Sequence, residues 1–356
     1  MIEEFGWSEQ LRRQFAPFAA RGLQPARVTV QQRGLLTLAA ADGELHGRIS
    51  GKLAHEAAPG ALPVAGDWVA IAARAAEGAA TIHAVLPRRT AFLRRAANTS
   101  QEAQVVAANV DIAFLVASLN RDFNLRRLER YLAAARESGA QPIVLLSKAD
   151  LVEDAGAALA EARSVAGDAP ALVVSAQTGQ GMEALAAWLA PGLTCAFLGS
   201  SGAGKSTLVN ALAGSELMST GAVREDDARG RHTTTYRELV RLPCGALALD
   251  TPGMRELGLL GAEEGVSATF EDIEMLAARC RFRDCSHGDE PGCAVRAALE
   301  TGELDPGRWR GFDKLRREIA HFDRREDPLA REAERRRWIA IHKAQRARRR
   351  SQEDWG

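Results

Sequence analysis

A glycine-rich segment in the middle of the chain limits the possible folds more than any other feature. Residues 199–207 read GSSGAGKST, which fits the pattern Gly-x4-Gly-Lys-Ser/Thr. An apolar run at 193–198 comes before it and a helix-forming run at 206–213 comes after it. Small residues between a strand and a helix let successive backbone N–H groups surround a phosphate, and the helix N-terminus adds partial positive charge. The segment therefore predicts an α/β domain that binds a nucleoside triphosphate.

This segment, called the phosphate loop below, has a predicted role for each residue type. Lys205 is expected to reach the outer phosphates and to take part in catalysis, and the Ser206 hydroxyl is expected to coordinate Mg²⁺. A Gly/Ser-rich turn without a ligand is the alternative, which the Lys-Ser pair at the right offset disfavours. The remaining predicted nucleotide-binding residues of the loop are Gly199, Ser200, Ser201, Gly202, Ala203, Gly204 and Thr207.

Length and composition limit the number of domains and the kinds of partner. The chain has 356 residues, enough for two or three domains with cores of their own. Lys plus Arg and Asp plus Glu both number 46, so the net charge is zero and only local clusters could bind nucleic acid. No apolar run approaches the ~20 residues of a membrane span. We therefore expect a cytoplasmic protein with no membrane partner.

The N-terminal part predicts a short lead-in, residues 1–25, and then a small barrel, residues 26–98. Short strand patterns separated by turns occur at 27–31, 35–39, 44–51, 67–72 and 79–86. Five such strands in roughly sixty residues suit a five-stranded barrel of the oligonucleotide-binding (OB) type, although other small barrels share the pattern. A basic run after the barrel is either a solvated linker or a phosphate contact. It consists of Arg88, Arg89, Arg94 and Arg95.

Residues 104–262 predict alternating strands and helices. Apolar runs at 111–118 and 142–147 flank a helical pattern at 125–137, which gives a βαβ unit and a parallel sheet. Polar residues follow two of the strands: Ser147, Lys148 and Asp150 after one, Ser175 and Ala176 after the next. Because ligands of open α/β sheets bind beyond the carboxyl ends of the strands, these residues are predicted to contact the nucleotide.

These two elements resemble the guanine-reading elements of GTPases. The resemblance implies that Asp150 accepts from guanine N1–H and the exocyclic amine, that Lys148 stacks its stem on the base, and that the Ala176 N–H donates to O6. Ser147 stands where GTPases usually have Asn or Thr, a departure that bears on base affinity or rigidity. In most GTPases these elements follow the phosphate loop, whereas here they precede it. The chain therefore resembles a circularly permuted GTPase.

Two segments after the phosphate loop are predicted to be switches that sense the nucleotide. The first, RGRHTTT, contains Thr234, which by resemblance completes Mg²⁺ coordination. The second, DTPG, runs from Asp250, expected to hold the metal through water, to Gly253, whose N–H senses the γ-phosphate. Met254 follows, where a water-orienting Gln is common. His232 is therefore the predicted catalytic residue that positions water, the alternative being a loop histidine bonded for structural reasons.

Residues 263–330 predict a third domain, which is helical and binds zinc. Three thiols and one imidazole occur within fourteen residues: Cys280, Cys285, His287 and Cys293. Such a set fills a tetrahedral zinc site with no open position, so the metal would be structural; unligated thiols are the alternative. The other two cysteines, Cys195 and Cys244, fall in predicted strands and are expected in the core.

Residues 331–356 form a predicted basic helix or tail. Nine Lys and Arg residues stand against two Glu between 331 and 350, with Trp338 and Ile341 among them. Basic runs are usually solvated, but this density beside a zinc domain favours contact with a polyphosphate backbone.

The whole arrangement closely resembles the ribosome small-subunit-dependent GTPase A family, RsgA (also called YjeQ), from about residue 26 to the tail. The most specific matches are ASLNRDFNLRRLERYL (117–132), GSSGAGKSTLVNAL (199–212), RGRHTTT (229–235), DTPGMRELGL (250–259) and CRFRDCSHGDEPGCAV (280–295). The resemblance implies a GTPase that binds GTP and GDP, is stimulated by the small ribosomal subunit and acts late in its assembly. It also implies rRNA binding, Mg²⁺ with the nucleotide and one Zn²⁺ per chain; we expect a monomer.

Two other functions stay open from the residues alone. An ATP-driven enzyme would use the same phosphate loop, although Asp150 argues against it, and comparing ATP with GTP binding would decide. A zinc-stabilised RNA-binding adaptor with weak or vestigial nucleotide hydrolysis is the second. Multiple-turnover phosphate release would exclude it.

Overall fold

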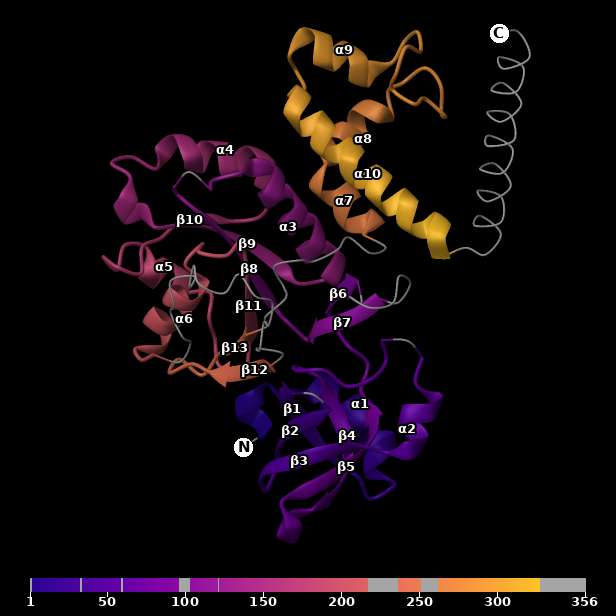
Figure 1. Ribbon diagram of the computed structural model, residues 1–356, viewed down its shortest axis with the longest axis vertical. Coiled ribbons are helices and arrows are strands. Elements are labelled where there is room, and N and C mark those ends of the chain that lie inside the picture. The colour runs from indigo at the N-terminus through magenta and orange to yellow at the C-terminus, as the bar shows by residue number, and fades with distance from the viewer. Residues whose placement is uncertain are drawn as a thin grey trace, which may run out of the picture.

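The computed structural model describes residues 2–32, 34–58, 60–95, 103–120, 122–216, 236–250 and 262–326. In Figure 1 the chain forms three units along its long axis. An indigo and violet barrel lies at the bottom, an α/β unit in the middle, and an orange and yellow helical unit at the top. This order matches the predicted multidomain architecture, and the exact domain boundaries stay a prediction.

The barrel has the predicted five strands. They are β1 (Gln24–Gln32), β2 (Leu35–Ala40), β3 (Gly43–Ile49), β4 (Trp68–Arg74) and β5 (Ala79–Val85). Their order is β1-β2-β3-β5-β4, and pairing of β1 with β4 closes the barrel. Alternate residues point inward, so that Val28, Leu38 and Ile82 are fully buried in its core. A short helix, α2 (Gly51–Glu56), follows β3.

The lead-in packs against the outside of this barrel. A 3-10 turn, η1 (Ile2–Phe5), precedes helix α1 (Glu9–Ala19), whose first turn is capped by the Ser8 hydroxyl. Their apolar side chains meet Trp68 of β4, and the rings of Trp7 and Trp68 lie 4.9 Å apart. The apolar side of the lead-in therefore packs on the outer face of the barrel.

The α/β unit has the strand order β10-β9-β8-β11-β13-β12. Its strands are β8 (Ile112–Ser118), β9 (Gln141–Ser147), β10 (Ala171–Val173), β11 (Thr194–Leu198), β12 (Tyr236–Arg241) and β13 (Leu247–Asp250). All neighbours are parallel except β12, which is antiparallel to β13. One face of the sheet is covered by α3 (Leu125–Ser138) and α4 (Gly156–Ala166), the other by α5 (Met182–Ala186) and α6 (Lys205–Ala213).

Strand pairing joins the barrel to the α/β unit. Strand β12 is antiparallel to β1, with Val30 opposite Glu238 and Gln32 opposite Tyr236, so one eleven-stranded sheet runs through both units. A hairpin that the sequence did not predict, β6 (Ala91–Arg95) with β7 (Ala103–Ala108), lies between them in the chain.

One expectation was wrong in this region, and one residue of the basic run has a role that the sequence did not predict. The Arg88 guanidinium is engaged within the protein, because it forms a two-pronged ion pair with the fully buried Asp67, at 2.8 Å for each contact. Cys244 is not a core residue: it lies exposed in the turn between β12 and β13, whereas Cys195 is buried as expected.

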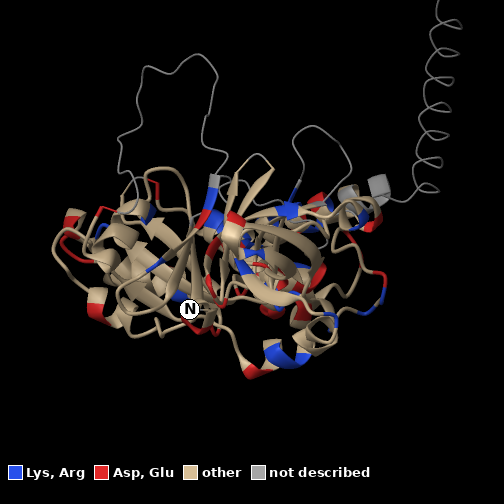
Figure 2. Cartoon of the chain, turned by 90° about the horizontal axis from the view of Figure 1, so that it is seen from below, with Lys and Arg blue, Asp and Glu red and all other residues tan. Residues whose placement is uncertain are grey.

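The helical unit is built from α7 (Glu263–Thr269), α8 (Glu271–Ala277), α9 (Ala294–Thr301) and α10 (Pro306–Glu326). Phe270 and Phe312 stack in its core, with ring centroids 5.3 Å apart. Gly265 lets α7 cross α3 closely, because a Cβ there would meet the Ala133 carbonyl. In Figure 2, acidic and basic residues both occur along the described parts of the chain in that view, in keeping with the zero net charge.

Candidate functional site

The phosphate loop joins β11 to α6, at the carboxyl edge of the parallel strands. Gly204 has φ 92°, a left-handed conformation that favours glycine and starts α6. A Cβ on Gly199 would lie 2.5 Å from the Val116 carbonyl of β8. The Lys205 ammonium donates to the carbonyls of Gly199 (2.8 Å) and Ser200 (2.6 Å). The lysine thus folds over its own loop, where outer phosphates of a nucleotide would bind.

The predicted guanine-reading residues converge on this loop. The buried Ser147 hydroxyl donates to the Ala203 carbonyl at 2.6 Å and so ties the end of β9 to the phosphate loop. Lys148 adopts φ 60°, and its Cε lies 3.9 Å from a Cβ built on Gly204. Ser147, the departure from the usual Asn or Thr, therefore still makes a cross-link through its hydroxyl.

The second element fixes the carboxylate of the first. Asp150 lies in the short turn η3 (Ala149–Leu151), and the Ser175 hydroxyl donates to its Oδ1. The same hydroxyl accepts from the backbone N–H groups of Gln177 and Thr178, so the turn that contains Ala176 is held around it. Non-local strand pairing, β9 with β10, brings these two turns side by side.

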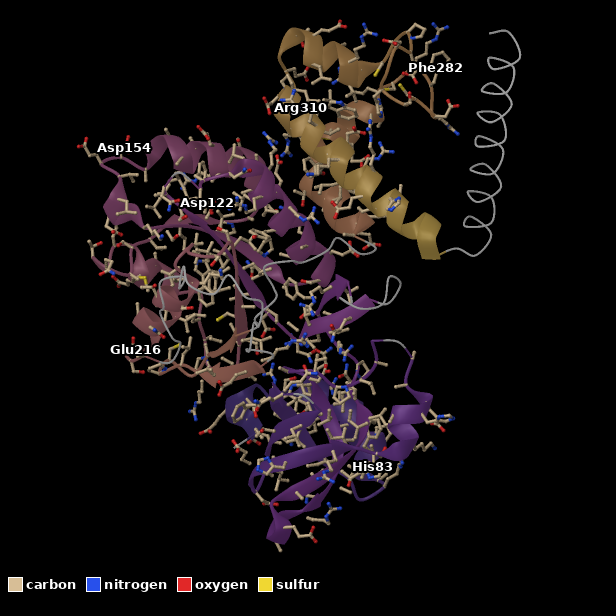
Figure 3. All side chains as sticks on the ribbon, in the orientation of Figure 1. His83, Asp122, Asp154, Glu216, Phe282 and Arg310 are labelled. Carbon is tan, nitrogen blue, oxygen red and sulfur yellow. The ribbon has the colours of Figure 1, made fainter. Side chains whose placement is uncertain are left out.

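One residue at this site was missed by sequence reasoning. Asp122, labelled in Figure 3, follows β8 and accepts hydrogen bonds from Ser200 of the phosphate loop and from Arg127, each at 2.6 Å. The Arg127 hydrogen bond, followed by that of Ser200, holds the pKa of Asp122 below its ordinary value. Since Asp122 and Ser200 are 78 residues apart, no local pattern indicates their contact.

The predicted switches lie largely outside the described residues. This holds for His232, Thr234, Gly253 and the basic tail, residues 331–356. Asp250 is the last residue of β13, and the side chain of this aspartate is not among those described. Because Leu249 pairs with Ala196 of β11, the backbone of Asp250 reaches the sheet edge at which the phosphate loop begins.

The Cys₃His cluster has the geometry of a tetrahedral metal site. All four ligand atoms of Cys280, Cys285, His287 and Cys293 lie within 4.8 Å of one another. Nδ1 of His287 is 3.6 Å from two sulfurs, and the Cys280 and Cys293 sulfurs are 3.9 Å apart. A zinc tetrahedron with ordinary bond lengths has edges of about 3.5 Å (S to N) and about 3.8 Å (S to S). The residues therefore fit a bound metal ion.

Burial, backbone N–H groups and the neighbouring thiols all affect the ionisation of this cluster. Burial opposes ionisation of Cys280, but backbone N–H groups of Val295 and Ala294 hold its pKa below the ordinary value. Burial raises the pKa of Cys285 to about 11, and the neighbouring thiols add to the effect. Thiols this close ionise together only when a cation compensates their charge.

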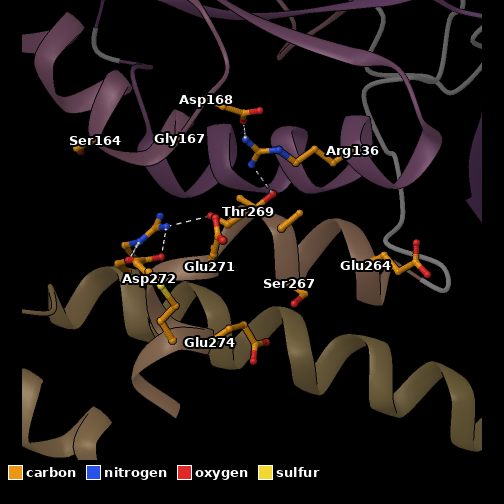
Figure 4. A pocket seen from close by; sticks show the side chains of 13 residues that line it. Arg136, Ser164, Gly167, Asp168, Glu264, Ser267, Thr269, Glu271, Asp272 and Glu274 are labelled. Carbon is orange, nitrogen blue, oxygen red and sulfur yellow. Dashed lines mark hydrogen bonds and ion pairs between the residues drawn. The ribbon is translucent and has the colours of Figure 1, made fainter. Parts of the chain in front are cut away.

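A groove of about 830 Å³ lies between the α/β unit and the helical unit (Figure 4). Arg136 of α3 reaches across it to Thr269 and also pairs with Asp168, while Arg308 of α10 pairs with Asp272. Of the predicted nucleotide-binding residues that the structure describes, none lines the groove. It belongs to the junction of the two units, which the hydrogen bond from Arg136 to Thr269 connects, while the two ion pairs each lie within one unit.

Fold and site together define a class of protein. The turns predicted to read the base precede the phosphate loop in the chain but meet it at one sheet edge, which is the arrangement expected of a circularly permuted GTPase. Among solved structures, YjeQ from Thermotoga maritima is 26% identical with a TM-score of 0.62, over 84% of this chain and 99% of that one. YloQ, a circularly permuted GTPase, is 23% identical with a TM-score of 0.57, over 86% of this chain and 96% of that one, and supports the fold.

Sequence comparison identifies the family. The RsgA GTPase family model matches residues 85–260. A small ribosomal subunit biogenesis GTPase RsgA of Opitutus terrae is 52% identical over 364 residues, 99% of each chain. A second, from Syntrophotalea carbinolica, is 46% identical over 328 residues, 90% of each chain. The chain belongs to the RsgA GTPase family and is an enzyme of the hydrolase class. Among its described helices, none is both long and apolar enough to cross a membrane.

Proposed function

We propose that this GTPase binds GTP between the phosphate loop and the turns after β9 and β10, and hydrolyses it to GDP and phosphate. The observation that carries the site assignment is the link from Ser147 to Ala203, which joins the base-reading strand to the phosphate loop at 2.6 Å. Asp150 would read guanine, while Lys205 and Ser206 would hold the outer phosphates and Mg²⁺. The bound Mg²⁺ would supply charge neutralisation at the phosphates.

The base assignment is tested by changing one acceptor. Asp150→Asn turns a pair of acceptors into one acceptor and one donor, so GTP should bind more weakly and xanthosine triphosphate more tightly. Asp154→Asn is the matched control, since this exposed aspartate only accepts from its neighbour Gly156 (Figure 3). Equal GTP affinity of Asp150→Asn and the parent would exclude Asp150 as the reader of guanine.

Two residues of the first predicted switch are assigned roles in GTP hydrolysis at this site. His232 is proposed to orient the attacking water, and Thr234 to complete the Mg²⁺ shell. His232→Ala is expected to lower kcat by a factor on the order of 10²–10⁴ with GTP binding nearly intact. Lys205→Ala is expected to lose most turnover. An unchanged kcat in His232→Ala, measured with small subunits present, would assign the role to another group.

The proposed partner is the small ribosomal subunit, in whose biogenesis the relatives are named, and the proposed location is the cytoplasm. Barrel and basic tail would contact rRNA, and hydrolysis would be stimulated by the subunit. GTP turnover measured with and without purified small subunits tests this. A protein that binds the subunit but releases no phosphate over many turnovers would be the RNA-binding adaptor instead. A monomeric state also remains a prediction.

The nucleotide is proposed to control subunit binding. Residues 251–261 connect β13 to α7, so a second switch that closes on a γ-phosphate would bias the helical unit. The GTP form should then bind the subunit more tightly than the GDP form, and the subunit should favour the GTP form in return. Co-sedimentation with a non-hydrolysable GTP analogue or GDP, at two salt concentrations, tests both the switch and the electrostatic share.

The metal is proposed to be one structural Zn²⁺ per chain. Three sulfurs and one imidazole nitrogen in a closed tetrahedron suit zinc and leave no position for a substrate. Elemental analysis of protein purified without chelators should give zinc at one equivalent. A stoichiometric content of another metal, or none, would contradict the proposal.

A further inference from the structure

The described residues of the connection between β8 and α3 lie beside the phosphate loop and are held by hydrogen bonds. Leu119 donates its backbone N–H to the Ser147 carbonyl at 2.8 Å, which fixes the start of the connection to β9. Asn120 Oδ1 accepts from the backbone N–H of Asp122 at 2.9 Å, and Asn124 caps the first turn of α3. The position of Asp122 is therefore set by the backbone on both sides.

Asp122 holds one residue of the phosphate loop from outside. Its Oδ2 accepts from the Ser200 hydroxyl and from the Arg127 guanidinium, each at 2.6 Å. The carbonyl of the same Ser200 accepts from the Lys205 ammonium at 2.6 Å. Ser200 is thus restrained twice, through its side chain by Asp122 and through its backbone by the phosphate-binding lysine.

The carboxylate that makes this contact is ionised at neutral pH. Its pKa lies below the ordinary value of 3.8, because Arg127 and then Ser200 donate to it, and Lys148 adds a favourable charge. A hydrogen bond to a charged acceptor is stronger than one between neutral groups. Asp122 is therefore suited to hold the hydroxyl of Ser200 in one orientation.

The same helix that fixes Asp122 also carries the helical unit. One residue before Arg127, Arg126 pairs with Glu129 and Asp305, and Arg130 pairs with Glu318 of α10 at 2.6 Å. Helix α3 is thus linked to the phosphate loop through Arg127 and Asp122, and to the helical unit through Arg126 and Arg130. Any displacement of α3 changes both contacts.

We infer that Asp122 is a positioning residue that fixes Ser200, and with it the backbone of the phosphate loop, to the first turn of α3. The inference rests on the proposed nucleotide site. Asp122 would affect nucleotide binding because the N–H groups of the phosphate loop must point at the phosphates before the nucleotide arrives. Without Asp122 the loop has more conformations to lose, so nucleotide should leave faster.

A double-mutant cycle tests this, using release of a fluorescent GDP analogue from the full-length protein. Asp122→Ala and Ser200→Ala should each speed release by about three- to tenfold, less than a fully buried charged hydrogen bond would give, because the aspartate is 41% exposed. The double variant should release no faster than the faster single variant. Asp122→Asn, which keeps an acceptor for Ser200, should lie closer to the parent.

The matched control is Asp168→Ala, which removes a 2.6 Å ion pair with Arg136 at the other end of α3 and does not touch the phosphate loop. It should leave GDP release unchanged. Rates that multiply in the double variant would show that Asp122 does not act through Ser200. Release equal to that of the control, with the same loss of Tm, would reduce Asp122 to a structural ion pair.

Nucleotide binding by the unsubstituted protein distinguishes failure of the proposed nucleotide site from failure of the role of Asp122. A parent that binds no guanine nucleotide would overturn the proposed function together with the role of Asp122. A parent that binds, but whose cycle is additive, would overturn the role of Asp122 alone. If Asp122→Ala does not fold, Asp122→Asn and Ser200→Ala complete the same cycle, with Ser200→Ala expected to have the larger effect.

Discussion

The α/β unit is attached to the barrel and to the helical unit by different kinds of contact. On the barrel side, backbone hydrogen bonds between β1 and β12 continue one sheet through both units. The buried Arg27 lies behind this ladder and donates to Thr194 Oγ1 at 2.7 Å and to the carbonyls of Phe5, Gly66 and Asn109. Burial lowers its pKa to about 10, so it is still charged at neutral pH.

On the helical side, α7 packs closely on α3 and apolar residues of both units share one buried cluster. In the part of the chain that the structure describes, no strand pairing joins these two units, and ion pairs lie around the packed helices. Arg308 of α10 reaches Glu129 of α3 across the junction at 2.9 Å, while its two-pronged pair with Asp272, at 2.6 and 2.7 Å, lies within the helical unit. Arg130 and Glu318 form a second two-pronged pair, with 29% and 40% of their side chains exposed. Ion pairs of this exposure are weakened by salt.

The difference indicates which unit can move. Displacing the barrel would break a strand ladder and leave buried oxygens of several segments without a donor, which is costly. Displacing the helical unit would have to part α7 from α3 and exchange the surrounding ion pairs for water and ions, but among the described residues it would break no strand ladder. We therefore expect the helical unit to respond to nucleotide and partner, while the barrel and the sheet move as one body.

The largest predicted difference between the two sides comes from metal removal. Chelation, or Cys293→Ser, should unfold the helical unit, because binding of structural zinc supplies about 10–16 kcal/mol to small zinc modules. Hydrogen exchange should then show loss of protection in α9 and α10 with β1 and β12 unchanged. Cys244→Ser, at an exposed thiol outside the cluster, is the control. Loss of protection in both regions would mean that the units unfold together.

The next largest effect is predicted for Arg27→Met on the barrel side. The substitution leaves buried oxygens of three or more segments without their donor, so we expect a loss of about 3–5 kcal/mol in the free energy of unfolding. The loss should be nearly the same at low and high salt, since Arg27 is only 2% exposed. Arg48→Met, on the exposed face of β3, serves as control. A loss below 1 kcal/mol would remove the distinction between the two sides.

Local patterns in the sequence predicted much of this architecture. Barrel strands, the βαβ unit and the phosphate loop all follow from periodicity and turn residues within a few positions, and the Cys₃His set follows from spacing. The order of the predicted guanine-reading elements and the phosphate loop can also be read along the sequence. The motifs and their order could therefore be predicted without the structure.

The contacts between units could not be predicted in the same way. Outside the barrel, β1 pairs with β12, some two hundred residues away, and no residue pattern in either strand predicts this pairing. Arg27 and Arg88 look like surface residues until the structure shows their buried acceptors. Cys244 was misplaced because apolar neighbours on both sides suggested a strand through what is a turn.

A third prediction addresses the partly buried ion pairs of the helical side. Arg308→Met leaves the buried Glu129 with Arg126 alone, and we expect a loss of about 2–3 kcal/mol in the unfolding of the helical unit. Burial raises the pKa of Glu129. A carboxyl group with a raised pKa takes up a proton on folding, so the free energy of unfolding rises as the pH falls. The deficit should thus be smaller at pH 4.5 than at pH 7.

Glu129→Gln in the Arg308→Met background is the matching test, because it removes the charge that lacks its partner. Chemical denaturation of the double variant should recover part of the deficit at pH 7 and show little dependence on pH. A deficit that grows on acidification, or that Glu129→Gln leaves untouched, would contradict the electrostatic account of this side.

The smallest effect, and the sharpest comparison, is predicted for Glu318→Gln. This variant removes the pair between Arg130 and Glu318, which crosses from α3 to α10 and is partly exposed at both ends. Such pairs contribute about 0.5–1 kcal/mol at low salt and less at 0.5 M, because counterions screen the charges. Asp313→Asn is the matched control: its pair with Arg317 lies within α10 and joins no two units. Only Glu318→Gln should loosen the helical unit, seen as faster exchange in α7 and α10 at low salt and no difference from the parent at high salt. An effect that is equal at both salt concentrations would mean that the charge of Glu318 does not stabilise this junction, and it would contradict the expectation that salt-sensitive contacts let the helical unit move.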